Sequence, residues 1–336
     1  MHMADALVSP AVGGAMWVAA AGTTAYCARK VREESDPAKV PLMGVLGAFT
    51  FAAQMVNFQI PGTGSSGHLG GGLLLAILLG PHAAFLVISS VLVVQALFFA
   101  DGGLLALGAN IVNLGVFPAF VAYPLVYRLL ARDSLSPARI TVAAVAAALM
   151  GLMLGSLGVV LQTTVSGISA LPFPAFAGVM LPIHAAIGLV EGLVTAAVVV
   201  FIVRAQPEIV RRASAGRDLK GVALRGVVAG ILAAAVITAS GLAWFASEDP
   251  DGLEWSIERV AGEAGVTGDG ALAAPLTALQ ERLAIMPDYE SRDPETAGTG
   301  VAGLVGGAAT LLLAGVAGYV IHLRAKRTEK NPPHIT

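Results

Sequence analysis

The sequence is poor in charged and aromatic residues. Only 12% of its 336 residues are Asp, Glu, Lys or Arg and only 6% are Phe, Trp or Tyr, whereas 56% are hydrophobic. Soluble domains carry about 25% charged residues, and the mean hydropathy here is +0.78. These proportions predict a polytopic membrane protein, in which the many small residues let helices approach closely.

Other absences exclude whole classes of protein. The single cysteine, Cys27, rules out an intramolecular disulfide and a four-cysteine zinc or iron–sulfur site. The net charge of -2 is uninformative about nucleic acid, but the lack of a basic stripe with interleaved aromatics argues against a nucleic-acid partner. Residues 1–10 have no basic stretch before the first apolar run, so we expect no secretory signal.

The apolar stretches predict an all-α chain of nine membrane spans. Eight of them approach the roughly 20 residues that a helix needs to cross a bilayer. The ninth, residues 69–80, is short and opens with glycines, and we expect the loop at 62–68 to replace its first part. The eight long stretches lie at residues 10–28, 40–60, 83–100, 104–126, 139–162, 179–203, 222–246 and 298–323.

The distribution of Lys and Arg predicts the orientation. If the N-terminus is outside, nine spans place four segments in the cytoplasm, and the last of these is at the C-terminus. Those segments carry 4, 3, 6 and 4 Lys and Arg residues, 17 of the chain's 20, as the positive-inside rule requires. They are residues 29–39, 127–139, 203–225 and 324–330.

The stretch GTGSSGHLGGG, residues 62–72, fits two phosphate-loop patterns imperfectly. It contains G-x-G-x-x-G, but His68 and Leu69 stand where a P-loop has its Lys and its hydroxyl residue. The orientation puts this stretch outside, away from cellular ATP, and we expect no strand before it. We therefore interpret its glycines as backbone freedom around His68 rather than as a phosphate cradle.

A few polar residues lie within or at the edge of the predicted spans, where each is costly unless partnered. Most are near outer helix ends, which predicts a polar pocket that opens outward. For any single Asn or Gln, a hydrogen bond between helices is the alternative. The residues are His2, Asp5, Gln54, Asn57, Gln59, His68, Gln95, Asp101, Asn110, Asn113, His184 and Glu191.

The first two residues offer a metal chelate if Met1 carries a free amine. The amine, the amide nitrogen of His2 and the Nδ1 atom of His2 close a five-membered and a six-membered ring around one ion. With a fourth nitrogen they form a square, a geometry typical of Ni(II) or Cu(II). His68, in its glycine-rich loop, is the best candidate for that fourth donor.

Several motifs together resemble a known family, the NikM/CbiM substrate-capture components of energy-coupling factor importers. They are MHMADALVSP, MVNFQIPGTGSSGHLGGG, the run from residue 73 to 113, and HAAIGLVEGLVT, and they cover roughly residues 1–205. The resemblance implies a seven-helix bundle with the N-terminus inserted from the outer face. It also implies that Met1, His2 and His68 hold the metal.

A second resemblance begins after residue 220. SEDPDGLEWSIERVAG and the later MPDYE are similar to the PDGLE domain, here fused as in NikMN-type chains. We expect domains at 1–205 and 222–323, a cytoplasmic linker at 206–221 and a cytoplasmic tail at 324–336. Two helices of the second domain would bracket an outer loop, residues 247–297, which is long enough to suggest a function of its own.

The resemblance implies a transport subunit and not an enzyme. It would capture Ni(II) or Co(II) at the plasma membrane and work with a transmembrane coupling subunit and two cytoplasmic ATPases. No cofactor is expected. We expect the other polar residues to surround the metal or control access to it: Asp5, Gln54, Asn57, Gln95, Asp101, Asn110, Asn113, His184 and Glu191.

Two alternatives stay open. A self-sufficient, proton-coupled nickel/cobalt carrier would use Glu191 as its proton relay, but the sequence lacks the HxxxxDH signature of such carriers. A purely structural membrane subunit would leave the pairing of Met1 and His2 with His68 unexplained.

Overall fold

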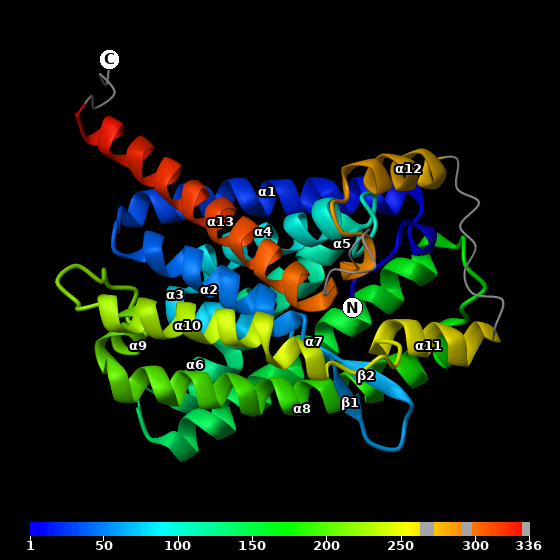
Figure 1. Ribbon diagram of the computed structural model, residues 1–336, viewed down its shortest axis with the longest axis horizontal. Helices are drawn as coiled ribbons and strands as arrows, with labels where there is room; N and C mark the ends of the chain where they lie inside the picture. Colours follow the sequence, from blue (N-terminus) through cyan, green and yellow to red (C-terminus); the bar gives the residue numbers. More distant parts are fainter. Residues whose placement is uncertain (133, 263–271, 291–297, 331–336) are drawn as a thin grey trace.

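The computed structural model describes residues 1–132, 134–262, 272–290 and 298–330 (Figure 1). In these ranges the first half of the chain forms a helical bundle with one short hairpin. Its elements are η1 (Asp5–Leu7), α1 (Pro10–Glu34), α2 (Lys39–Gln54), β1 (Phe58–Ile60), β2 (Ser65–Gly67), α3 (Gly72–Leu79), α4 (Pro81–Phe99), α5 (Leu107–Ile111), η2 (Val112–Tyr127), α6 (Arg128–Ala131), α7 (Pro137–Ser166) and α8 (Phe173–Ala205).

The second half adds two long helices and several short ones. Its elements are α9 (Pro207–Ser214), α10 (Arg225–Ser240), η3 (Leu242–Phe245), α11 (Gly252–Ala261), α12 (Ala273–Leu283), η5 (Pro287–Tyr289) and α13 (Gly298–Lys330). The predicted linker, 206–221, therefore contains the helix α9. The predicted loop, 247–297, contains α11, α12 and η5, so it is structured along much of its length.

Within the described ranges, six helical runs are long and apolar enough to cross a membrane. The other three predicted spans correspond to α1, α2 and α3, of which α2 has only 16 residues and α3 only 8. The prediction of a mostly helical membrane protein is confirmed, whereas the count of nine crossings stays a prediction. The six runs are Pro81–Phe99, Leu107–Ala131, Pro137–Ser166, Phe173–Ala205, Arg225–Phe245 and Gly300–Lys326.

The hairpin corrects the sequence analysis in two respects. Helix α2 ends at Gln54 and not near residue 60, because the chain turns into β1, which pairs antiparallel with β2. The expectation of an all-α fold with no strand before the glycine-rich loop was therefore wrong at this place. Gly62 and Gly64, with φ of 77° and 72°, form the turn between the strands, a conformation that glycine adopts without steric cost.

The two halves pack directly against each other. Helix α2 lies against both α10 and α13, and α13 crosses the bundle obliquely (Figure 1). Gly306 of α13 faces the ring of Phe51 so closely that any Cβ at this position would collide with it. Small residues thus bring the second half onto the first, as is common for helices in lipid.

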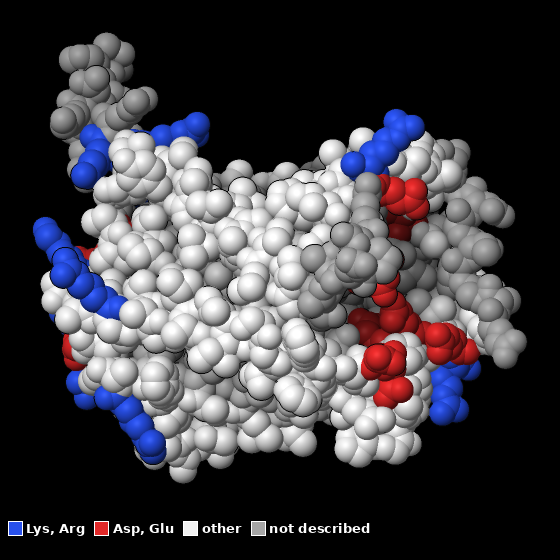
Figure 2. Space-filling model, in the orientation of Figure 1, with Lys and Arg blue, Asp and Glu red and all other residues white. Residues whose placement is uncertain are grey.

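The outer surface separates an apolar middle from two charged ends. In Figure 2 the middle of the molecule carries almost no charged residue, whereas Lys and Arg gather at the left end and Asp and Glu at the right. Exposed apolar side chains on the long helices include Leu125, Val165 and Phe201, which are 61%, 74% and 57% exposed. This belt is suited to contact lipid and supports a multi-pass membrane protein.

Candidate metal centre

The N-terminus enters the right end of the bundle in Figure 1, which we call the N-terminal end. Met1 and Met3 are 4% and 0% exposed. The Asn110 side chain accepts a hydrogen bond from the Met3 amide at 2.8 Å and donates one to the Met3 carbonyl at 3.2 Å. The Asp5 carboxylate accepts the amide of Ala106 at 3.0 Å. These contacts fix the first residues, up to the beginning of η1, inside the protein.

The two predicted imidazole ligands meet at this buried terminus. The rings of His2 and His68 lie nearly parallel, with centroids 5.0 Å apart and an interplanar angle of 9°. His2 Nδ1 is 3.3 Å from a carboxylate oxygen of Asp101, and His2 Nε2 is buried without a hydrogen-bond partner. The structure therefore brings Met1, His2 and His68 together, and their role as metal ligands stays a prediction.

The surroundings of His68 favour one tautomer. Its Nδ1 lies 3.1 Å from the carbonyl oxygen of Leu69, so the proton belongs on Nδ1, which donates to that carbonyl. In the neutral ring the lone pair is then on Nε2, the nitrogen that lies 3.7 Å from Asp251 Oδ2. A backbone carbonyl that fixes the tautomer in this way is common behind metal-binding histidines.

A carboxylate that the sequence analysis did not single out lies between these groups. The Oδ2 atom of Asp251 is 3.0 Å from the Met1 amine and 3.7 Å from His68 Nε2. Burial raises the pKa of the Asp251 carboxyl, but the charge of the Met1 ammonium opposes this effect, and the pKa lies well below its usual range. Asp251 is therefore ionised and forms the ion pair of the N-terminal amine.

Asp251 belongs to a segment that is fastened to the hairpin, residues 247–255, which we call the cover segment. The Pro250 carbonyl accepts the Ser66 amide at 2.8 Å, and the Asp249 carbonyl accepts the Ser66 hydroxyl at 2.7 Å. Trp255 Nε1 donates to the Thr63 carbonyl at 3.0 Å. The cover segment thus lies along the same strand that leads to His68.

The residues of the PDGLE motif explain why the cover segment lies here. Oδ1 of Asp251 caps helix α11 by accepting the amides of Leu253 and Glu254, and the Glu254 side chain returns to the Asp251 amide, which completes a capping box. Gly252 packs so closely on α8 that a Cβ would lie 3.1 Å from His184 and 3.0 Å from Ile187. The motif therefore seats α11 on the bundle and directs Asp251 Oδ2 at the terminus.

Between these groups is a cavity of about 10 Å³, which is about the volume that one water needs. It is lined by Met1, Gly67, His68, Gly70, Leu114, Leu152, His184, Ile187, Asp251 and Gly252. Among the described residues, no three His, Cys, Asp or Glu side chains gather as a metal-holding group. A metal at this place would need main-chain nitrogen donors as well as the two imidazoles.

Burial also sets the charge of His2. Removal from water lowers the pKa of its imidazole to about 4, and the nearby Asp101 opposes this shift only in part. At neutral pH His2 is therefore an uncharged imidazole, the form that binds metals.

Glu191 contacts the site through the backbone. Its two carboxylate oxygens accept the amides of Gly70 and Gly71 at 2.8 and 3.2 Å, at the beginning of helix α3, where a negative charge is favourable. Gln54 donates to the carbonyl of Gly70 at 2.9 Å and accepts from Gln95 at 2.9 Å. These residues hold the chain just after His68 in place.

The remaining predicted residues surround the centre, where His184 lines the cavity and Asp101 lies beside His2. Asn113 bonds to Gln162 at 2.8 Å, and His184 Nδ1 lies 2.9 Å from the carbonyl of its own helix at Met180. The carbonyl of Asn57 accepts the amide of Ser247. Asp101 contacts the Tyr289 hydroxyl, and burial together with Asp101 raises the pKa of Tyr289. Gln162 and Tyr289, like Asp251, were missed by the sequence analysis.

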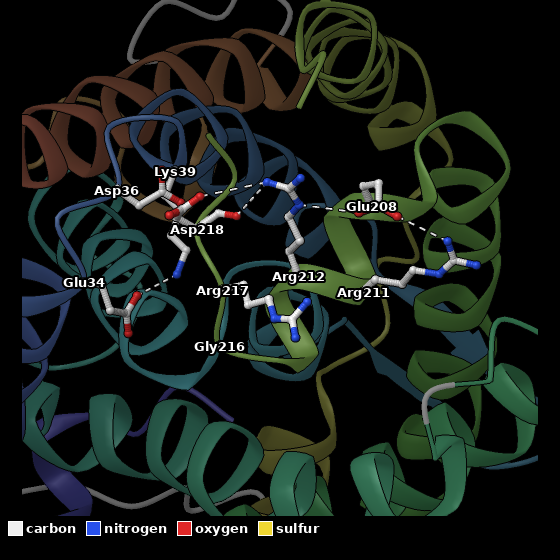
Figure 3. Close-up of a pocket in the computed structure, with 9 residues that line it drawn as sticks. All are labelled: Glu34, Asp36, Lys39, Glu208, Arg211, Arg212, Gly216, Arg217 and Asp218. Carbon is white, nitrogen blue, oxygen red and sulfur yellow. Dashed lines mark hydrogen bonds and ion pairs between the residues drawn. The ribbon is translucent and has the colours of Figure 1, made fainter. Parts of the chain in front are cut away.

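The opposite end of the molecule has a different chemistry. A pocket of about 650 Å³ lies there among charged side chains of α1, α2 and α9 (Figure 3). Lys39 pairs with Glu34 at 2.6 Å, and Arg212 pairs with Glu208 at 3.4 Å and reaches toward Asp218. Glu34, Glu208 and Asp218 thus face Lys or Arg, and Asp36 accepts the amides of Ala38 and Leu219, so this pocket has little to offer a cation.

Two known families match the sequence of this chain. Residues 2–209 match the family described as cobalt uptake substrate-specific transmembrane region, CbiM, and residues 225–323 match the PDGLE domain. Fold and site thus define a multi-pass membrane protein of the metal-transport class. The chain belongs to the CbiM family, carries a fused PDGLE domain, and so confirms the NikMN-type organisation that the motifs predicted.

Individual relatives agree with this assignment. A putative fused nickel transport protein NikMN of Archaeoglobus fulgidus is 33% identical over 322 residues, which are 93% of this chain and 96% of that protein. A fused nickel transport protein NikMN of Rhodobacter capsulatus is 33% identical over 79% of this chain and 78% of its own length. A crystal structure of a transition metal transporter is 29% identical, with a TM-score of 0.55, over 66% of this chain and all of that one.

Proposed function

We propose that the chain is the metal-capture subunit of an energy-coupling factor importer. It binds Ni(II), or Co(II), outside the cell and delivers the ion for ATP-driven uptake. The observation that carries this proposal is the burial of the Met1 amine beside His2 and His68. The family match and the relatives named as nickel transport proteins support it.

The proposed site has four nitrogen donors in one plane: the Met1 amine, the His2 amide, His2 Nδ1 and His68 Nε2. To close it, the amine and the His2 amide would each release a proton, the amine would leave Asp251, and His2 Nδ1 would leave Asp101 with the ring proton on Nε2. A deprotonated amide in such a plane suits low-spin d⁸ Ni(II) better than Co(II). Cu(II) would bind more tightly still by the Irving–Williams order. The supply of metal ions or the coupling of binding to transport must therefore exclude Cu(II).

The chelate requires that Met1 is the mature first residue. Mass spectrometry of the intact protein checks this directly, because removal of Met1 or a longer leader changes the mass by a known amount. A leader would turn the Met1 amine into an amide, and loss of Met1 would turn the His2 amide into the terminal amine, so either change removes one of the proposed donors.

The distribution of charge supports the predicted orientation. The described Lys and Arg side chains gather mainly at the end that holds α9, and the carboxylates gather at the N-terminal end (Figure 2). By the positive-inside rule the first end is cytoplasmic and the second faces outward. The subunit then captures the metal from outside, in the plasma membrane of a bacterial-type cell, with its C-terminus in the cytoplasm.

Energy comes from partner proteins in this proposal. The chain has no intact Walker A motif, since His68 stands in place of its lysine. A transmembrane coupling subunit and two cytoplasmic ATPases would supply the work, and the capture domain is residues 1–205, joined through 206–221 to the PDGLE domain, 222–323. The contacts of Glu191 with two backbone amides support a structural role over the proton relay of a self-sufficient carrier.

His68→Ala tests the proposed ligand set. The unchanged chain should give the visible absorption band of a yellow square-planar Ni(II) complex, and the variant should lose it because one planar donor is gone. His82→Ala is the control, since His82 lies on α4 next to Glu34 at the opposite end. If the band survives in His68→Ala, His68 is not a ligand and the proposed site is wrong.

A further inference from the structure

A large hollow adjoins the metal centre at the N-terminal end. Its volume is about 1060 Å³, and both halves of the chain line it, from residues 2–103 and 243–300. A divalent ion with six waters needs roughly 180 Å³ at about 30 Å³ per water. The hollow, which we call the vestibule, therefore has room for a fully hydrated metal ion.

The vestibule is strongly negative. Eight of its lining residues are Asp or Glu, and the described lining residues include no Lys or Arg. The outermost are Glu248, Asp288 and Glu290, which are exposed, whereas Asp5 is only 6% exposed. Clefts lined by charge of one sign raise the local concentration and the association rate of the opposite ion by factors of about 10 to 10³.

The deep wall of the vestibule ends in groups that point to a ligand. The side chain of His2 is 6% exposed, and its Nε2 atom has no hydrogen-bond partner. Asp5 likewise has one buried carboxylate oxygen, Oδ2, without a partner. Buried polar atoms are normally satisfied, so these two atoms are suited to the water shell of an ion rather than to another protein group.

The vestibule also borders the inner cavity. His68 and Asp251 line both spaces, whereas Met1 lines only the cavity and His2 only the vestibule. An ion that moves from the vestibule to the proposed chelate therefore passes the Asp251 carboxylate and the His68 ring. The PDGLE domain supplies Asp251 and the three outer carboxylates, so the fused domain shapes this route.

We propose that the vestibule is the access route for hydrated divalent cations, and that the PDGLE domain serves metal capture by lining this route with carboxylates. The inference rests on the proposed function, because it assumes that an ion binds at Met1, His2 and His68. It predicts that the outer carboxylates control how fast the ion arrives, and that they leave the bound complex unchanged.

The test is a kinetic comparison on the full chain in detergent. The variant Glu248→Gln, Asp288→Asn, Glu290→Gln removes three outer charges, and Asn is well tolerated at position 288, where φ is 51°. The matched control, Glu33→Gln, Glu208→Gln, Asp218→Asn, removes three charges at the opposite end. Stopped-flow growth of the Ni(II) band gives the association rate constant, and a chelator chase gives the dissociation rate constant.

At about 0.01 M salt, where the screening length is about 30 Å, we expect association to be roughly 3- to 10-fold slower in the vestibule variant. The difference should vanish near 1 M salt, where that length is about 3 Å. The band, the dissociation rate and the control variant should match the unchanged chain. Unchanged association at low salt would overturn the proposal, and so would a slower rate that does not depend on salt.

The same experiment separates this inference from the proposed function. If the unchanged chain forms no planar Ni(II) band, or if His68→Ala keeps it, the proposed chelate fails. If these tests support the chelate but the vestibule variant binds Ni(II) as fast as the unchanged chain, only the proposed access route is contradicted.

Discussion

The centre is assembled from residues that are far apart in the sequence. The Met1 amine and His68 Nε2 lie 3.0 and 3.7 Å from Asp251 Oδ2. The three residues come from the terminus, the hairpin and the PDGLE domain. Met1 and His68 could be predicted as candidate ligands, because amine, amide and imidazole nitrogens form a known chelate. The approach of Asp251 could not, because no local pattern encodes a contact across 250 residues.

Asp251→Asn tests that contact at the level of one residue. Asn caps helices as well as Asp does, so α11 should keep its N-cap while the Met1 ammonium loses its partner. We expect the metal-free protein to lose about 1–3 kcal/mol of stability, visible as a lower Tm in detergent. Asp249→Asn, at a side chain that accepts a hydrogen bond from Gln59 at 3.0 Å, should change Tm little. Equal Tm values for the two variants would contradict the role of this ion pair.

Among the elements, the helices were predictable and the hairpin was not. Long apolar runs fix where helices such as α4, α7 and α8 lie, because lipid and core both favour them. Strands β1 and β2 have 3 residues each, too few to show the alternation of a strand. The apolar residues Phe58 and Ile60 therefore extended the predicted span beyond Gln54, where the helix actually ends.

The packing of helix α11 on α8 gives a prediction about these elements. In Gly252→Ala the new methyl group would press on His184 and Ile187, and such overpacking costs about 1–3 kcal/mol. The cover segment should then leave the hairpin more often. We expect the Ser66 amide, which donates to Pro250, to exchange its hydrogen about tenfold faster or more, since about 1.4 kcal/mol is a factor of ten.

Gly14→Ala is the matched control, because a Cβ at Gly14 meets nothing within 4 Å. It should leave the exchange of the Ser66 amide unchanged. If Gly252→Ala also leaves it unchanged, the close packing of Gly252 does not hold the cover segment on the hairpin.

For the whole molecule, the separation of charge at the two ends predicts its orientation. The composition alone was sufficient to predict a membrane protein. It could not predict that the second half packs along α2 and brings its carboxylates over the N-terminal end, because this depends on close contacts such as Gly306 on Phe51.

Single cysteines can test the orientation in intact cells. Cys27 is 0% exposed and can be replaced by Ser to give a cysteine-free chain. Pro61→Cys, in the hairpin turn, should react with a membrane-impermeant maleimide added outside. Arg217→Cys, at the other end, should react only after the membrane is opened. The reverse pattern would show that the N-terminal end faces the cytoplasm.

The central claim is that the Met1 amine is a metal ligand, and one calorimetric comparison tests it most directly. Ni(II) is titrated into the full chain with a free Met1 amine, into the same chain with the Met1 amine acetylated, and into a chain with one Gly added after Thr336. The amine-dependent chelate predicts tight binding in the first and third proteins and no measurable binding in the second. Equal affinity in all three would contradict it.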